Sequence, residues 1–162
     1  MKIILFTICI LIYLQSELPA QSDSTNNVFQ NDATGMSLVY PRGWNIIDSR
    51  TIDLSLKEFS GLVLIDTTSQ IKGVMSIFIK FDNEGNEFKN NNFTNEFQIF
   101  DTTSIAYYKD PINQAGFTYY KLYINSNIHK LYIIAIVKQE YFDKYKREIE
   151  SVVRTIKFIN RN

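Results

Sequence analysis

The pattern of apolar and polar side chains predicts three β-strands in the first half of the chain. The clearest is 74–81, where apolar residues occupy every second position, which is the period of a half-buried strand. The stretch 36–40 alternates in the same way and ends at the turn residues Pro41-Arg42-Gly43. The run 61–65 is apolar throughout, as is typical of a strand covered on both faces. We expect 61–65 and 74–81 to lie near the centre of a sheet.

A long β-hairpin is predicted in the second half, with 117–124 and 128–138 on either side of the turn residues 125–127. A two-residue loop at 126–127 would place Ile124 opposite His129, Leu122 opposite Leu131 and Tyr120 opposite Ile133, and on the other face Tyr123 opposite Lys130, Lys121 opposite Tyr132 and Tyr119 opposite Ile134. Side chains alternate between faces, so a slip of one residue would exchange the two faces.

The chain closes with a predicted amphipathic helix over 141–155. Its apolar residues follow the three- and four-residue spacing of one helical face: Phe142, Tyr145, Ile149, Val152, Val153 and Ile156. Charged residues take the solvent side: Lys144, Lys146, Arg147, Glu148 and Glu150. The residues 157–159 are expected to form a short edge strand or a packed tail. In contrast, 82–95 is polar and rich in asparagine, which predicts a surface loop with at most a short helix.

The N-terminus has the pattern of a secretory leader. Lys2 precedes an apolar run over 3–14, and the segment ends at the small residue Ala20. A helix that spans a bilayer needs roughly 20 apolar residues, so we expect cleavage after 20 rather than a stable membrane span. The residues 21–27 lack apolar side chains and are expected to be a flexible lead-in. The remainder, 28–162, has the size of a single domain.

Composition and charge argue against several kinds of site. The formal net charge is zero, which provides no electrostatic basis for binding nucleic acid or an anionic membrane. The single cysteine, Cys9, lies in the leader, and His129 is the only histidine. A hydrolytic triad or a transition-metal site needs more than these residues, and no glycine-rich phosphate loop is present. We therefore expect no enzyme, no metal and no cofactor.

Two segments carry a resemblance to a known family. The stretch Thr34-Gly35-Met36-Ser37-Leu38-Val39-Tyr40-Pro41-Arg42-Gly43-Trp44 resembles the opening strand, turn and tryptophan of the PsbP-like and Mog1-like α/β/α sandwich proteins, and the hairpin followed by a helix that runs into Val153-Arg154-Thr155-Ile156-Lys157-Phe158 is similar to their closing segment. The resemblance implies an α+β fold: a mostly antiparallel β-sheet with flanking helices and the C-terminal helix on the sheet. It also implies an accessory, chaperone-like or partner-binding role.

Aromatic residues provide the candidate interaction surface. Aromatic side chains make up 14% of the chain, and exposed ones favour protein or apolar ligands. We single out Trp44, Tyr119, Tyr123 and Tyr132. Two structural alternatives stay open: Trp44 can plug one end of the core, and a helix can cover the tyrosine-bearing face of the hairpin.

Three functions follow as hypotheses. The first is an exported, non-catalytic binding or accessory module, periplasmic or extracellular, whose partner is another exported or envelope protein. The second is a carrier of a small apolar ligand or lipid, which would require a substantial pocket. The third is a carboxylate-based hydrolase, which would require two acids across an open cleft.

Overall fold

The computed structural model describes residues 26–48, 61–70, 73–100 and 104–159. The predicted leader 1–20 and most of the predicted lead-in lie outside these residues, and the first strand begins at Asn27. Within the described ranges, no helix is both long enough and apolar enough to cross a membrane.

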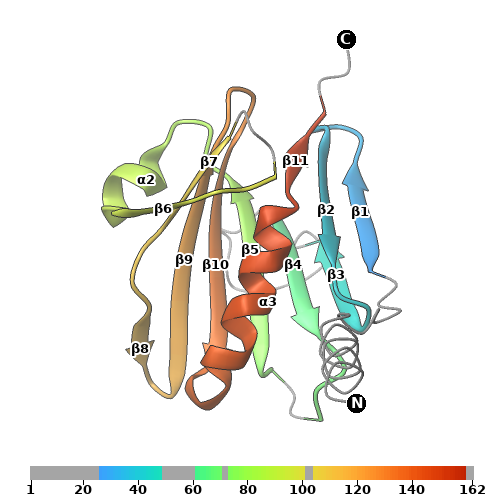
Figure 1. Cartoon of the computed structure of the whole chain (residues 1–162), viewed down its shortest axis with the longest axis vertical. Helices are drawn as coiled ribbons and strands as arrows, with labels where there is room; N and C mark the ends of the chain where they lie inside the picture. Colours follow the sequence, from blue (N-terminus) through green and yellow to red (C-terminus); the bar gives the residue numbers. More distant parts are fainter. Residues whose placement is uncertain (1–25, 49–60, 71–72, 101–103, 160–162) are drawn as a thin grey trace, which may run out of the picture.

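The strands form two antiparallel sheets (Figure 1). In the small sheet the order is β1 (Asn27–Asn31), β2 (Met36–Tyr40) and β11 (Lys157–Phe158). The large sheet has the order β3 (Trp44–Asp48), β4 (Gly61–Asp66), β5 (Met75–Phe81), β10 (Lys130–Lys138), β9 (Phe117–Asn125), β7 (Ile105–Tyr108) and β6 (Asn95–Phe97), and β8 (Ile112–Gln114) also pairs with β9. The long central strands are therefore those that the sequence predicts most clearly.

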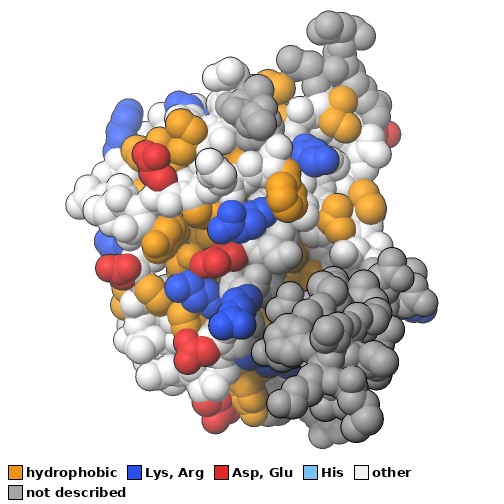
Figure 2. Space-filling model, viewed as in Figure 1, with side chains coloured by type: hydrophobic (Ala, Val, Ile, Leu, Met, Phe, Trp, Pro, Cys, Tyr) orange, Lys and Arg blue, Asp and Glu red, His pale blue; other side chains and the backbone are white. Residues whose placement is uncertain are grey.

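The C-terminal helix α3 (Phe142–Arg154) follows the short 3-10 turn η2 (Gln139–Tyr141) and packs on one face of the large sheet (Figure 1). Its buried residues lie on the predicted apolar face: Tyr145, Ile149, Val152 and Val153. They join one core with the inward-facing side chains of the sheet, among them Leu64, Ile77 and Leu122. Basic and acidic side chains alternate over the exposed side of this face of the molecule (Figure 2). The predicted helix and its orientation are confirmed.

The predicted hairpin is confirmed, but its register differs by two residues. Leu131 lies opposite Ile124 and Ile133 opposite Leu122, because the turn is longer than predicted. Asn125 pairs with Lys130, which leaves four residues in the loop. The Ser126 hydroxyl accepts from the His129 amide at 2.9 Å and donates to the His129 carbonyl at 2.6 Å, which closes the loop. A shift of two residues keeps every side chain on its predicted face.

The opposite face of the large sheet is covered at one end by α2 (Asn86–Asn91). The Asp82 carboxylate stabilises the start of α2, because it accepts hydrogen bonds from the amides of Asn86 and Glu87, each at 3.0 Å. The Phe88 ring lies 5.0 Å from that of Tyr123, and Phe93 lies 6.4 Å from Tyr132. Helices thus lie on both faces of a mostly antiparallel sheet, as the α+β prediction requires.

The corner between the two sheets is the predicted turn at Pro41-Arg42-Gly43. The Trp44 amide donates to the Pro41 carbonyl at 3.1 Å, and Gly43 has a φ of 92°, a conformation that favours glycine. A Cβ at Gly43 would lie 2.1 Å from Cγ2 of Thr68. This corner brings the end of β2 beside α3 and so forms the site described next.

Candidate functional site

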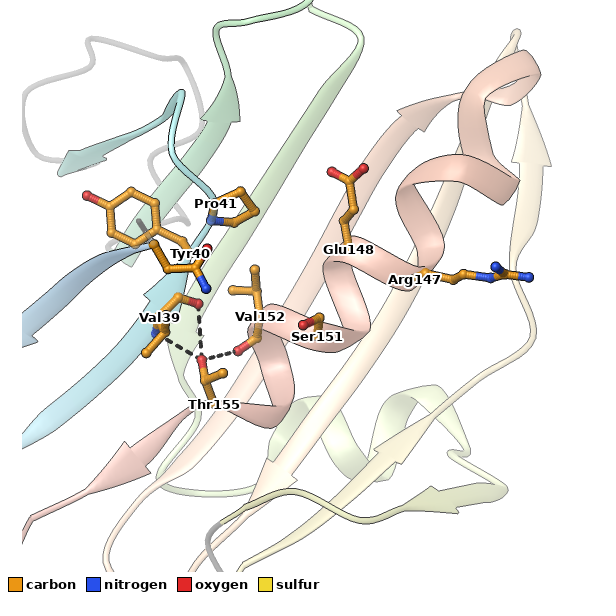
Figure 3. A pocket seen from close by; sticks show the side chains of 9 residues that line it. Val39, Tyr40, Pro41, Arg147, Glu148, Ser151, Val152 and Thr155 are labelled. Carbon is orange, nitrogen blue, oxygen red and sulfur yellow. Dashed lines mark hydrogen bonds between the residues drawn. The ribbon is translucent and has the colours of Figure 1, made fainter. Parts of the chain in front are cut away.

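A notch of about 240 Å³ lies between the end of β2 and α3 (Figure 3). Both apolar and polar residues line it: Asn26, Val39, Tyr40, Pro41, Arg147, Glu148, Ser151, Val152 and Thr155. Val39, Pro41 and Val152 form the apolar part, and α3 contributes most of the polar groups. The volume suits one side chain of a partner rather than a whole drug-sized ligand.

The Thr155 hydroxyl fixes the spacing of the notch. It accepts from the Val39 amide at 2.8 Å, and its oxygen lies 2.7 Å from the Val152 carbonyl oxygen and 3.1 Å from that of Val39. These contacts join the last turn of α3 to β2 where β11 no longer pairs with it. The Thr155 side chain therefore holds β2 against α3 beyond the point where β11 pairs with β2 (Figure 3).

Replacing Thr155 with valine is expected to lower the free energy of unfolding by about 1–2 kcal/mol, because the half-buried Val39 amide loses its acceptor. Thr155→Ser keeps the hydroxyl and serves as the matched control, with a smaller loss. Urea unfolding of both variants measures the difference. Equal losses in the two variants would contradict the role given to the hydroxyl.

Glu148 and Ser151 at the rim of the notch have polar groups that are free to bind. Neither side chain takes part in a hydrogen bond or ion pair within the part of the chain that the structure describes. Ser151 is exposed and Glu148 is half-buried. In Figure 3 the Glu148 carboxylate rises from α3 beside Pro41, whereas the Arg147 guanidinium extends away from β2. The unpaired acidic group that borders the apolar floor is therefore Glu148.

A second carboxylate, Asp66, lies near Glu148 at the end of β4. Burial raises the pKa of Glu148; Lys144 opposes this shift and Asp66 adds to it. Burial would also raise the pKa of Asp66, but hydrogen bonds from Thr68 and from the Tyr145 hydroxyl outweigh it, and that pKa lies below its usual value. The two carboxyls thus have pKa values shifted in opposite directions.

The two shifts predict opposite effects of neutral substitutions on stability. The pKa of Glu148 is raised in the folded protein. Its contribution to the free energy of unfolding is therefore present below the pKa of the unfolded state and is lost as pH rises through the pKa of the folded state. Glu148→Gln should therefore stabilise the fold near pH 7, by about 0.5 kcal/mol at most because solvent screens a half-exposed group. Near pH 3, where wild-type Glu148 is protonated, the two proteins should be equally stable.

Asp66→Asn is the matched comparison. The folded pKa of Asp66 is depressed, so its contribution is present above the unfolded pKa and is lost as pH falls. This variant should be less stable than wild type near pH 7. Urea midpoints at both pH values test the pair of variants, and a change of the same sign in both near pH 7 would contradict the assignment.

The aromatic residues singled out from the sequence lie mostly in the interior. Trp44 and Tyr132 are each 3% exposed and Tyr123 is 1% exposed, so none of these three rings presents a surface to a partner. This corrects the predicted interaction surface, which is reduced to the half-buried Tyr119. The cause is the cover described above: Phe88 and Phe93 pack over the tyrosines, and Trp44 joins the core.

Other candidate chemistry has structural roles. The Asp82 carboxylate accepts from the first amides of α2, and Glu87 pairs with Lys80 at 2.6 Å. No group of three or more potential metal ligands occurs within the described ranges. The His129 ring lies 5.1 Å from that of Phe81 and 5.3 Å from that of Phe158. A larger hollow, about 570 Å³, is lined by the mostly exposed residues 115–117 and 138–140, and its open lining would not enclose a lipid.

The notch residues escaped the sequence analysis because the spacing of apolar residues places Arg147 and Glu148 on the solvent side of the helix. That assignment is correct for α3 alone. The signal that could have identified them is the Pro41-Arg42-Gly43 turn, which ends β2 beside the helix. The turn predicts where β2 ends, but the contact between the turn and the helix joins segments that are far apart in the sequence, and no local pattern predicts that contact.

Searches against protein-family models and curated proteins gave no match. Solved structures do match. The solution structure of cyanobacterial PsbP (CyanoP) from Synechocystis gives a TM-score of 0.57 at 9% identity, over 88% of this chain and 98% of that one. A crystal structure from Bacteroides thetaiotaomicron gives a TM-score of 0.50 at 15% identity. That match covers 83% of this chain and 48% of the other one.

The Saccharomyces cerevisiae Ran-binding protein Mog1p gives a TM-score of 0.48 at 11% identity, over 85% of this chain and 97% of that one. At such identities the likeness is one of fold. The elements on which the sequence resemblance rests are all present in this chain, from the β2 turn and Trp44 to the long hairpin and the closing helix. The chain therefore shares the α+β fold of the PsbP structure, as its opening and closing segments predict.

Proposed function

We propose that this chain is an exported, non-catalytic accessory module that binds another exported or envelope protein through the notch between β2 and α3. It acts outside the cytoplasm, in the periplasm or beyond the cell. The partner places an apolar side chain on Val39, Pro41 and Val152 and a basic group against Glu148.

One observation carries the proposal: a half-buried carboxylate that makes no hydrogen bond or ion pair with the described residues borders an apolar floor. Burial raises the pKa of Glu148, so the free protein bears a cost for keeping this group ionised at neutral pH. A basic group from a partner would remove that cost, because an opposite charge nearby favours the ionised form. Groups with such perturbed pKa values gather at functional sites.

The apolar floor supports the same proposal. The aromatic residues that would otherwise attract a partner are buried, whereas the notch combines a concave apolar surface with polar groups that are free to bind. Pockets that take one anchoring side chain, surrounded by polar groups, are where binding energy concentrates in protein interfaces.

Site-specific photo-crosslinking tests the proposal. The full chain carries a photoreactive amino acid at Ser151, which is exposed at the notch, or at Gln114, which is exposed on β8, and is recovered from the exported fraction after irradiation. We expect a discrete adduct from position 151 and none from position 114. No adduct at 151, or the same adduct at both positions, would overturn the proposal.

A further inference from the structure

Strand β1 is the outer strand of the small sheet. It pairs with β2 over all five of its residues, from Asn27 opposite Tyr40 to Asn31 opposite Met36. Its other side pairs with no strand in the described part of the chain, and β1 lies at the margin of the molecule (Figure 1). A free sheet edge carries unpaired amide and carbonyl groups that can accept another strand.

The sequence and register of β1 contain none of the features that usually protect an edge strand from pairing. Its sequence is Asn-Val-Phe-Gln-Asn, with no charged residue and no proline, and its register with β2 is continuous, without a bulge. Val28 is 68% exposed and lies on the same side of the sheet as its partner Val39. Proteins that must keep an edge single place lysine, proline or a bulge there.

We propose that the free edge of β1 pairs with β1 of a second copy of this chain, antiparallel and about a two-fold axis at Phe29. In this register Val28 lies opposite the partner's Gln30, Asn27 opposite the partner's Asn31, and the two Phe29 residues face each other. The pairing joins the small sheets of both copies into one continuous sheet.

The strand is self-complementary in this register. Along β1, every second residue directs its amide and carbonyl groups toward the free edge. A two-fold axis through Phe29 pairs residues that are separated by an even number of positions, so a residue whose groups point to the edge always meets another such residue. Asparagine meets asparagine at both ends, and the one ring of the strand meets its copy at the centre, an arrangement that favours cross-strand contact. No charge is opposed by a like charge along the pair.

The net charge of the chain also permits the pairing. A formal charge of zero produces no long-range repulsion between copies. Five paired residues form a small interface, below the size of standard stable complexes, so the association should depend on concentration. The notch is formed within one copy, so the function proposed above does not depend on this dimer.

Sedimentation analysis of the protein recovered from the exported fraction tests the dimer. We expect a shift from monomer to dimer as concentration rises toward about 1 mM, the range of weak contacts. Val28→Lys should weaken the association at least about tenfold by placing charge on the edge. Ile112→Lys is the matched control, because Ile112 is 44% exposed on β8, which pairs with β9 alone among the described strands. Monomer at every concentration, or equal loss in both variants, would overturn the proposal.

Cysteine pairing tests the register. The chain has one cysteine, Cys9, so wild type reports any background. Val28→Cys and Gln30→Cys proteins are oxidised separately and as a mixture. The proposed register predicts a disulfide-linked dimer that forms mainly in the mixture, because position 28 meets position 30 of the partner at a distance suited to a disulfide. Equal cross-linking of Val28→Cys alone, or none in the mixture, would overturn it.

Discussion

Replacing Ile149 with alanine is expected to lower the free energy of unfolding by about 2–5 kcal/mol, the largest loss of any substitution considered for α3. Ile149 is fully buried at 0% exposure, midway between Tyr145 and Val152 on the face that packs against the sheet. Removing its side chain leaves a cavity between two rigid elements, and helices of this length depend on tertiary packing rather than on intrinsic propensity.

Urea unfolding of Ile149→Ala against Ser151→Ala measures this effect. Ser151 lies two residues away on the exposed side, so its truncation should change stability by no more than about 0.5 kcal/mol. If Ile149→Ala cost less than about 1 kcal/mol, α3 would not be the main cover of this face of the sheet.

Gly61→Ala is expected to cost about 3 kcal/mol, although alanine is normally the gentlest substitution for glycine. Gly61 pairs with Lys80 at the start of β4, and a Cβ there would lie 2.1 Å from the Ile79 carbonyl oxygen. The obstacle is backbone, which cannot move aside without separating β4 from β5. Space rather than a special dihedral angle requires glycine at this position.

Gly116→Ala separates these two causes. Gly116 has a φ of 79°, and a Cβ there would have no atom within 4 Å, so alanine meets only the cost of the left-handed conformation, about 1–2 kcal/mol. Thermal and urea unfolding of both variants should show the greater loss for Gly61→Ala. The reverse order would mean that β4 and β5 are spaced more loosely at this point.

The regular elements could be predicted because each has a strong period. The stretches 36–40, 61–65 and 74–81 correspond to β2, β4 and β5, and the spacing of apolar residues predicts α3 with its correct face. Strands of three or four residues, such as β6 and β7, are too short to show a period. The predicted hairpin register was wrong for a local reason: the Ser126 hydroxyl closes a loop that is longer than predicted.

The candidate site could not be predicted because burial depends on distant segments. Tyrosine is equally suited to a strand and to an interface, and what buries Tyr123 is Phe88 from a segment that is otherwise polar. Conversely, Glu148 belongs to the solvent side of its helix, and its pKa is raised because packing against other elements partly buries it and, to a lesser extent, because Asp66 of β4 lies near. Both outcomes follow from packing between elements rather than from sequence pattern.

The proposed function depends above all on the notch holding a partner through Glu148. The most direct test measures the yield of the Ser151 photo-adduct in wild type, in Glu148→Lys and in Lys89→Glu, a charge reversal at an exposed position on α2. We predict that Glu148→Lys reduces the adduct at least about tenfold, as loss of a paired charge does at interfaces, and that Lys89→Glu leaves it unchanged. An adduct that persists in Glu148→Lys would contradict the account.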